Sequence, residues 1–324
     1  MAAFLQAVQS VIEILLMIAL GFILQKKQLF SMPFQNDISK LVMDIALPCS
    51  IFMAVLNDLT IKKLASLTIG FILVFGEVIL GYLISFVIIK WFKISPLRRT
   101  ITINTMVNSN TVFIGLPLNL ALFGNKSIGY FLVYYVVTIV STWSFGVYLI
   151  SRDDPEKQKS QQHFHWADIF SRPLQGFIAA IAILLIKIPF KSFALPQFLT
   201  QSLTYIGSMV IPLSLIYIGC ILAKAGLKSI YFDKDTLVAL FGRFIIGPAL
   251  MIIIVIIAQK YGIKLLSTEK QTYIIQASVP ALATLPILAE KYHLDIRYAT
   301  NVVVITTVAF LVVIPVMMTL SEFI

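Results

Sequence analysis

The stretch NSNTVFIGLP (residues 108–117) lies in the middle of an apolar run that covers residues 99–123. A second run, residues 271–290, is interrupted at a similar depth by QASVPALATLP (residues 276–286). A proline inside a helix removes one backbone donor and clashes with an earlier carbonyl. Such unpaired backbone is tolerated within a membrane only where it is buried in protein or faces a wet cavity. Both stretches therefore predict broken helices beside a cavity, and the alternative is a pair of ordinary proline kinks.

The composition predicts an integral membrane protein. Hydrophobic residues make up 59% of the 324 residues and charged residues only 12%, whereas soluble domains carry about 25% charged residues. The 25 Lys and Arg residues outnumber the 15 Asp and Glu residues, but they are dispersed among short loops, which argues against a nucleic-acid-binding face. Cys49 and Cys220 lie inside apolar segments and are interpreted as packing residues. No apolar run carries a nucleophile with a nearby base, so an enzyme is not expected.

Ten apolar runs follow one another along the chain, each about as long as the 20 residues that cross a hydrocarbon core of about 30 Å. They cover residues 4–24, 38–57, 64–89, 99–123, 128–150, 170–189, 198–223, 235–258, 271–290 and 296–320. The longest polar break, residues 151–169, separates a first unit of residues 1–150 from a second unit of residues 170–324. The HFH stretch in this break lacks the further ligands that would complete a metal site, so we interpret the break as a solvated linker.

The orientation follows from the distribution of basic residues. Loops after odd-numbered runs hold twice as many Lys and Arg residues as loops after even-numbered runs. Basic loops stay in the cytoplasm, which places the linker inside and both termini outside a plasma membrane. Since each unit contains five runs, the second unit enters the membrane upside down relative to the first.

The two units also resemble each other in sequence. FGEVILG (residues 75–81) matches FGRFIIG (residues 241–247), LPCS (residues 47–50) matches IPLS (residues 211–214), and GLP (residues 115–117) matches TLP (residues 284–286). The three matches occur in the same order, which predicts two inverted five-helix repeats. In transporters, inverted repeats place the substrate near the midplane between discontinuous helices.

These motifs carry a family resemblance. NTVFIGLP (residues 110–117) resembles the N-T-x-x-x-G-x-P stretch of the auxin efflux carrier family, which includes plant PIN carriers and bacterial malate or malonate carriers. RFIIGPA (residues 243–249), IQASVP (residues 275–280) and PILAEKY (residues 286–292) are similar to further segments of that family. The long cytoplasmic loop of many plant members is absent, and the short linker is similar to that of bacterial members.

The resemblance implies an all-α fold of ten transmembrane helices, shared with bile-acid symporters and sodium/proton antiporters. In that fold the broken helices 4 and 9 cross. Helices 1, 2, 6 and 7 would form a scaffold domain, which would also supply the contact surface of a homodimer. Helices 3–5 and 8–10 would form a mobile transport domain.

Four charged residues lie well inside the apolar runs, away from their ends, where charge is costly and therefore suggests function. Glu77 and Arg243 occupy equivalent positions of the two repeats. Two roles are open for this pair. The two residues form a buried ion pair, or Arg243 binds a carboxylate of the substrate. Asp44 lies close to the predicted crossing, where a desolvated carboxylate would hold a proton more readily. Glu13 has no partner in the repeat, and no role is assigned to it.

The predicted substrate site lies where the two breaks meet. Half-helix N-termini favour negative charge there, and neutral polar side chains add hydrogen-bond donors and acceptors. The residues predicted to bind substrate are Asn108, Asn110, Thr111, Gln276, Ser278, Pro280, Thr284 and Arg243.

Together these features predict a secondary carrier for a small organic anion, with elevator-like alternating access. A dicarboxylate such as malate is the first choice of substrate, and Asp44 and Glu77 are the candidates for proton coupling. The alternatives are an exporter or uniporter of an auxin-like aromatic carboxylate, and an anion channel or receptor on the same scaffold. We expect the lipid bilayer as a partner, and we expect no cofactor, metal or nucleic acid.

Overall fold

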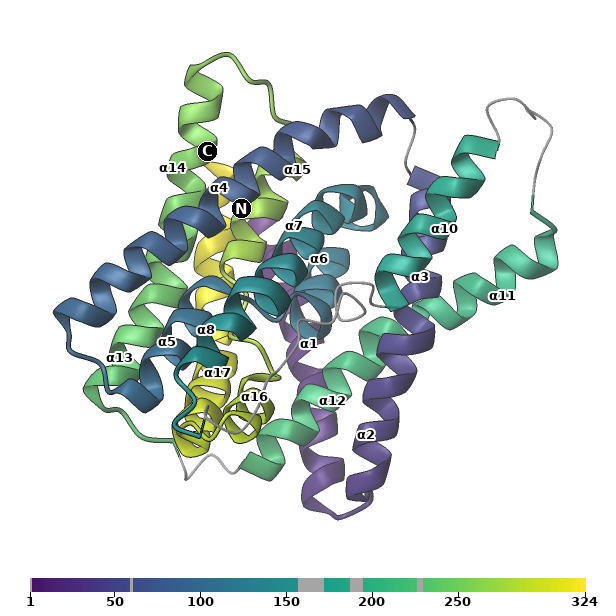
Figure 1. Ribbon diagram of the computed structural model, residues 1–324. Helices are drawn as coiled ribbons and strands as arrows, with labels where there is room; N and C mark the ends of the chain where they lie inside the picture. Colours follow the sequence, from purple (N-terminus) through teal and green to yellow (C-terminus); the bar gives the residue numbers. More distant parts are fainter. Residues whose placement is uncertain (1, 59–60, 157–171, 187–194, 226–229) are drawn as a thin grey trace.

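The computed structural model describes residues 2–58, 61–156, 172–186, 195–225 and 230–324 (Figure 1). Within these ranges the regular structure is helical, and the extended backbone forms one isolated antiparallel bridge. The helices of the first half are α1 (Ala2–Lys26), α2 (Met32–Lys40), α3 (Leu47–Asp58), α4 (Ile61–Trp91), α5 (Pro96–Val107), α6 (Leu116–Phe123), α7 (Ile128–Ser141) and α8 (Val147–Arg152).

The helices of the second half are α10 (Arg172–Ile186), α11 (Gln197–Ser208), α12 (Val210–Ala225), α13 (Lys234–Phe241), α14 (Gly247–Lys260), α15 (Ser267–Ala277), α16 (Leu285–Lys291) and α17 (Ile296–Glu322). Short π-helical turns continue several of them, over Leu41–Ala46, Thr111–Gly115, Thr142–Gly146 and Gly242–Ile246. Within the described residues, helical segments cover most of each of the ten apolar runs. Most of the linker predicted at 151–169 lies outside the described residues.

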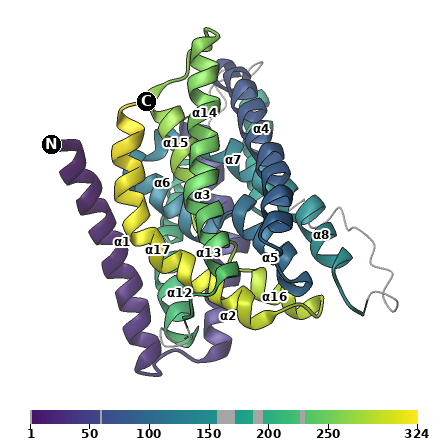
Figure 2. The ribbon, with the colours of Figure 1, turned by 90° about the vertical axis from the view of Figure 1, so that its left-hand side faces the viewer.

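The helices pack in two groups. In the scaffold group (α1–α3 and α10–α12), α1 packs along α12, and α3 packs against α10 and α11. In the break group (α4–α8 and α13–α17), α4 packs against α5, α7 and α14, while α17 packs against α13, α15 and α16. Figure 1 shows the scaffold group on the right and most of the break group on the left. Figure 2 shows α1 beside α17, where the two groups meet.

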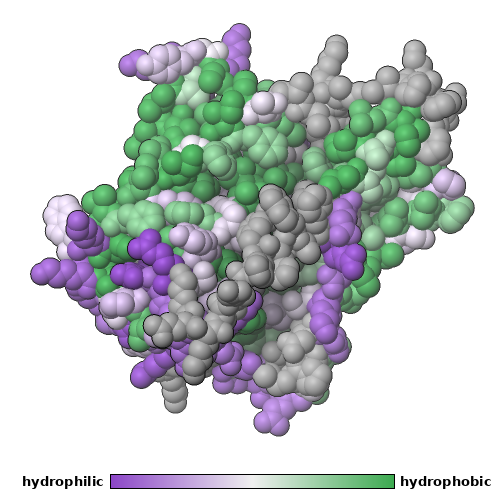
Figure 3. Space-filling view, viewed as in Figure 1, coloured by the Kyte–Doolittle hydropathy of each residue, from purple (hydrophilic) through white to green (hydrophobic). Residues whose placement is uncertain are grey.

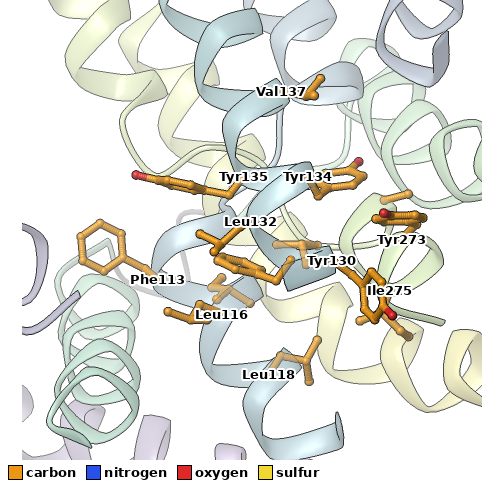
Figure 4. Close-up of a cluster of buried hydrophobic side chains, with 14 of the residues drawn as sticks. Phe113, Leu116, Leu118, Tyr130, Leu132, Tyr134, Tyr135, Val137, Tyr273 and Ile275 are labelled. Atoms are coloured by element: carbon orange, nitrogen blue, oxygen red, sulfur yellow. The ribbon is translucent and has the colours of Figure 1, made fainter. Parts of the chain in front are cut away.

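Helix α7 lies at the centre of the molecule. Eleven of its residues are buried, around its whole circumference, which is typical of a helix enclosed by other helices. Tyr134 and Tyr135 extend to different sides of α7 (Figure 4). The ring of Tyr130 meets Tyr273 of α15 edge to face, with 6.4 Å between the ring centroids. This central helix therefore joins the first half of the chain to the second.

The outer surface is strongly apolar. Along α4 the exposed side chains include Phe71, Ile72, Phe75, Leu83 and Val87. Figure 3 shows hydrophobic residues over much of this face, with hydrophilic residues gathered mainly toward the end formed by α5 and α13. Six helices of the described part of the chain are long and apolar enough to cross a membrane. The runs at 99–123 and 271–290 are not among the six, because each is divided into two shorter helices.

A charged cluster ties three helix starts together at the polar end. Arg98, in the first turn of α5, donates to Asp233 and Asp295 at 2.7 Å each. These two aspartates cap the N-termini of α13 and α17. Burial alone would raise the pKa of the Asp233 carboxyl, but hydrogen bonds from Thr236 and Arg98 outweigh it and hold the pKa below its ordinary value. One guanidinium from the first half thus fixes two helices of the second half.

Candidate functional site

Two interrupted helices meet inside the break group. Helix α5 ends at Val107 and α15 ends at Ala277. The chain between each of these ends and the following helical turn is not helical, and Ser109 and Ala281 pair there as an antiparallel bridge. The backbone N–H of Asn110 donates to the carbonyl of Pro280 at 2.8 Å. The two breaks therefore satisfy part of each other's backbone, as a buried interruption requires.

The local sequence explains why the helices stop here. Pro280 has no N–H to continue the ladder. The hydroxyl of Ser278 donates to the carbonyl of Ile274 at 2.9 Å. The side-chain oxygen of Asn110 accepts from the N–H of Phe113 at 3.2 Å and so caps the next helical turn. Polar residues and prolines in these two stretches thus replace the helical hydrogen bonds that are lost.

Gln276 locks the two broken segments together. Its side-chain amide donates to the carbonyl of Gly115 at 2.9 Å. A Cβ atom at Gly115 would lie 2.3 Å from the Gln276 Oε1 atom, so the close approach requires glycine at position 115. Gln276 was predicted to bind substrate, and the structure shows it fully buried in this contact.

Asn108 lies in a hydrogen-bond network within the break group. Its side-chain nitrogen donates to the hydroxyl of Tyr82 and to the Oδ1 atom of Asn104, both at 2.9 Å. Its side-chain oxygen accepts from the hydroxyl of Ser141 at 2.7 Å. The network connects α4, α5 and α7, and Asn108 is not among the residues that line the cavity described next.

A small cavity lies between the breaks and the scaffold group. The breaks contribute Asn110 and Ala283, and the π-helical turn after the first break contributes Ile114. Helix α12 contributes Ile218, Ile221 and Leu222, and α17 contributes Val303, Val304 and Thr307. The hydroxyl of Thr307 already donates to the carbonyl of Val303 at 2.7 Å.

Asn110 is the residue of this lining that carries a side-chain amide. The side-chain oxygen of Asn110 accepts from the N–H of Phe113. The side-chain NH₂ group of Asn110 therefore points away from that N–H. Within the described residues the nitrogen of this NH₂ group has no acceptor. Sequence reasoning identified Asn110 but missed the lining from α12 and α17, because purely apolar stretches carry no signal of function. In the last apolar run, the adjacent polar residues Thr306 and Thr307 were the sequence signal that could have pointed to α17.

Thr111 and Thr284 begin the segments that follow the breaks. Thr111 is buried at the start of the π-helical turn after Asn110, and Thr284 is partly exposed at the start of α16. Neither residue lines the cavity. The N–H of Ala281 donates to the hydroxyl oxygen of Thr306 at 3.3 Å, which holds the second break against α17.

Arg243 is buried beside the breaks but outside the cavity lining. Its guanidinium donates to the backbone carbonyls of Met106, Val107 and Ala277. In the part of the chain that the structure describes, Arg243 forms no ion pair. The Glu77 carboxylate accepts from the hydroxyl of Tyr134 at 3.4 Å, and both groups interact electrostatically with Arg243.

The two proton-coupling candidates lie in different surroundings. Glu77 is 3% exposed, within the break group. Asp44 is exposed, in the π-helical turn Leu41–Ala46 that packs against α10, α11 and α12. The structure therefore brings Glu77, but not Asp44, close to the ends of the broken helices. Among the described residues no three His, Cys, Asp or Glu side chains gather as metal ligands would.

The chain is similar to known membrane transporters along most of its length. The chain matches a family described as membrane transport protein over residues 6–318. It is 24% identical over 308 residues to the uncharacterized transporter MJ1031 of Methanocaldococcus jannaschii. The aligned region covers 94% of this chain and 95% of that protein. It is also 26% identical over 199 residues to the uncharacterized transporter C5D6.04 of Schizosaccharomyces pombe. Here the aligned region covers 54% of this chain and 44% of that protein.

Proposed function

Because the chain belongs to the membrane transport protein family, we propose that it is a secondary carrier that moves a small organic anion across the membrane by alternating access. The resemblance to auxin efflux carriers that the motifs predict is confirmed by this membership. The chain is a multi-pass membrane transporter. Its substrate, its coupling and its movement are inferred below.

The position of Asn110 is the observation that carries the proposal. Asn110 belongs to a cavity lining that otherwise consists mainly of aliphatic side chains, and we assign its side-chain NH₂ group as the donor to the substrate. Asn110 also caps the segment from Thr111 to Phe123, whose N-terminus presents the positive end of the helix dipole. A hydrogen-bond donor beside such an N-terminus favours an anionic group.

The lining also selects between the two classes of anion expected from the sequence. None of the nine lining residues is charged, and the guanidinium of Arg243 already donates to three carbonyls. The cavity has room for about one water molecule, so it would have to widen to admit either acid. A second carboxylate, as in malate, would then meet a lining with no charged partner, which is costly. We therefore favour a monocarboxylate with an apolar body over the dicarboxylate that the sequence suggested.

The packing supports an elevator-like movement. The cavity lies between α12 of the scaffold group and the breaks, so a sliding of one group past the other would carry a bound anion across the membrane. The two groups contain the helices assigned above to a scaffold domain and a transport domain. The chain ends lie near the same end of the molecule (Figures 1 and 2), as an even number of crossings requires. The proposal includes ten crossings as two inverted repeats, termini outside the plasma membrane, and a homodimer formed through the scaffold group.

Glu77 is the residue we assign to proton coupling, since it is a buried carboxylate beside the broken helix ends and Tyr134. Asp44 is set aside because its side chain is exposed away from the breaks. If Glu77 carries the proton, Glu77→Gln should bind substrate but lose the dependence of uptake on the pH gradient. Uptake by Glu77→Gln that follows the pH gradient as in the wild type would remove this assignment.

A thermal-shift titration of the purified protein tests the substrate class. Phenylacetate represents the monocarboxylates and malate the dicarboxylates. A ligand at 100 times its Kd stabilises the folded state by roughly 2.7 kcal/mol. We expect phenylacetate to stabilise the wild type more than malate does, and Asn110→Ala to lose that stabilisation. Greater stabilisation by malate would contradict the monocarboxylate assignment, and stabilisation by neither acid, nor by others of the two classes, would contradict the organic-anion proposal.

A further inference from the structure

Arg243 lies at the point where both broken helices end. It is 1% exposed, in the π-helical turn between α13 and α14. One terminal nitrogen, Nη1, donates to the carbonyls of Met106 and Val107 at 3.3 Å each, and the other, Nη2, donates to the carbonyl of Ala277 at 2.6 Å. A single side chain thus joins the C-terminal ends of α5 and α15.

These three carbonyls belong to the last turns of the two half-helices. The last carbonyls of a helix have no partner within it, and they carry the negative end of the helix dipole. Where two such ends meet inside the protein, their partial negative charges add, and a positive charge placed there is stabilising. The planar guanidinium, with five donors in a fixed arrangement, contacts several carbonyls at once.

The acidic neighbour of Arg243 does not replace these contacts. Glu77 interacts with Arg243 through charge but makes no ion pair with it among the described residues. The hydroxyl of Tyr134 donates to Glu77, and Tyr134 is also hydrogen-bonded to the Arg243 side chain. Arg243 therefore directs its hydrogen bonds at the helix ends and at Tyr134, rather than at a carboxylate or at the cavity.

Carriers with broken helices bind their coupled Na⁺ at unwound carbonyls and half-helix C-terminal ends. We propose that Arg243 is a built-in cation that occupies this carbonyl site, so that transport by this chain does not use Na⁺. The positive charge at the breaks then stays with the protein through the whole transport cycle. The inference rests on the proposed carrier function and specifies its coupling. Arg243 acts as a positioning residue, because it holds the helix ends rather than the substrate.

Wild-type protein in proteoliposomes tests the inference without any substitution. Uptake of radiolabelled phenylacetate is measured with external Na⁺ and with Na⁺ replaced by N-methylglucamine at the same ionic strength. We expect equal initial rates. A requirement for Na⁺ would overturn the inference while leaving the carrier function intact. If saturable uptake is absent under every ionic condition, the carrier function itself is contradicted.

Replacement of Arg243 tests the site itself. We expect Arg243→Ala to lose at least roughly tenfold in uptake rate, since several charge-assisted hydrogen bonds disappear, and guanidinium ion at non-denaturing concentration to restore part of it. Arg243→Lys should retain more activity than Arg243→Ala because it keeps the charge. Asn110→Ala is the control that guanidinium should not restore.

Size-exclusion chromatography separates folded from misfolded variants before the rates are compared. Full activity of Arg243→Ala would overturn the inference, and so would a folded Arg243→Ala protein that guanidinium does not restore. If Arg243→Ala fails to fold, the Na⁺ comparison on the wild type decides.

Discussion

Substitution of Asn110 separates the two tasks that the structure gives to this residue. Its side-chain oxygen caps the helical turn that starts at Thr111. The residue also lines the cavity, where we propose that its side-chain nitrogen binds the substrate. Loss of an N-cap costs about 1 kcal/mol of stability. Loss of a hydrogen bond to a charged ligand costs about 1.5–3 kcal/mol, which is roughly 10- to 100-fold in Kd. Asn110→Ala should show both losses.

Two further variants distinguish the cap from the ligand contact. Asn110→Ser keeps a capping oxygen, since serine is as good an N-cap as asparagine, but it lacks the amide donor. Asn110→Asp also keeps the cap and places a negative charge on the cavity wall. We expect both proteins to recover most of the stability lost in Asn110→Ala and to bind phenylacetate weakly, with Asn110→Asp the weaker.

Isothermal titration calorimetry measures the Kd, and thermal unfolding in the same detergent measures the stability. Wild-type affinity in Asn110→Ala and Asn110→Ser would refute the assignment of the amide to the substrate. Loss of affinity in Asn110→Ala that Asn110→Ser fully restores would mean that the residue acts only as a cap.

Other parts of the structure give three further expectations. Gly115→Ala should cost about 1–3 kcal/mol by overpacking because its Cβ would meet Gln276. Gly76 lies inside α4 with no neighbouring atom within 4 Å, so Gly76→Ala should be neutral or stabilise by up to about 1 kcal/mol in the same unfolding assay. Arg98→Ala should lower the free energy of unfolding by about 1 kcal/mol, since it removes a partly exposed ion-pair cluster. The lowered pKa of Asp233 means that its contribution to stability is present above its ordinary pKa of about 3.9 and is lost as the pH falls below that value; a thermal-unfolding profile of Asp233→Asn should show less of this acid-dependent loss.

The sequence predicted the positions of the breaks because proline, glycine and polar side chains act locally on the backbone. Asn110 was identifiable for the same reason. The contacts of Arg243 with carbonyls of α5 and α15 could not be predicted from the sequence, because they depend on how three separate helices pack. The apolar lining from α12 could not be distinguished from residues that face lipid, because both environments favour the same side chains. Asn108 was expected beside the substrate, and the network with Tyr82 that engages it instead is equally non-local.

Asp44 shows a second limit of the pattern. Its position one turn before a proline suggested a place near the crossing, but the direction of a side chain from a helix depends on the packing of that helix. The turn that carries Asp44 packs against α10 and α11 with its carboxylate outward. Glu77 and Arg243, which are equivalent in the repeat, are by contrast both buried.

Counterflow in proteoliposomes tests most directly whether this chain is an organic-anion carrier with its site at the breaks. Vesicles loaded with unlabelled phenylacetate are diluted into a trace of the labelled acid, and the label inside is followed over time. We predict a transient accumulation of label above equilibrium in the wild type and no accumulation in Asn110→Asp. A channel would only equilibrate the label, so the absence of an overshoot in the wild type, or an equal overshoot in Asn110→Asp, would contradict the account.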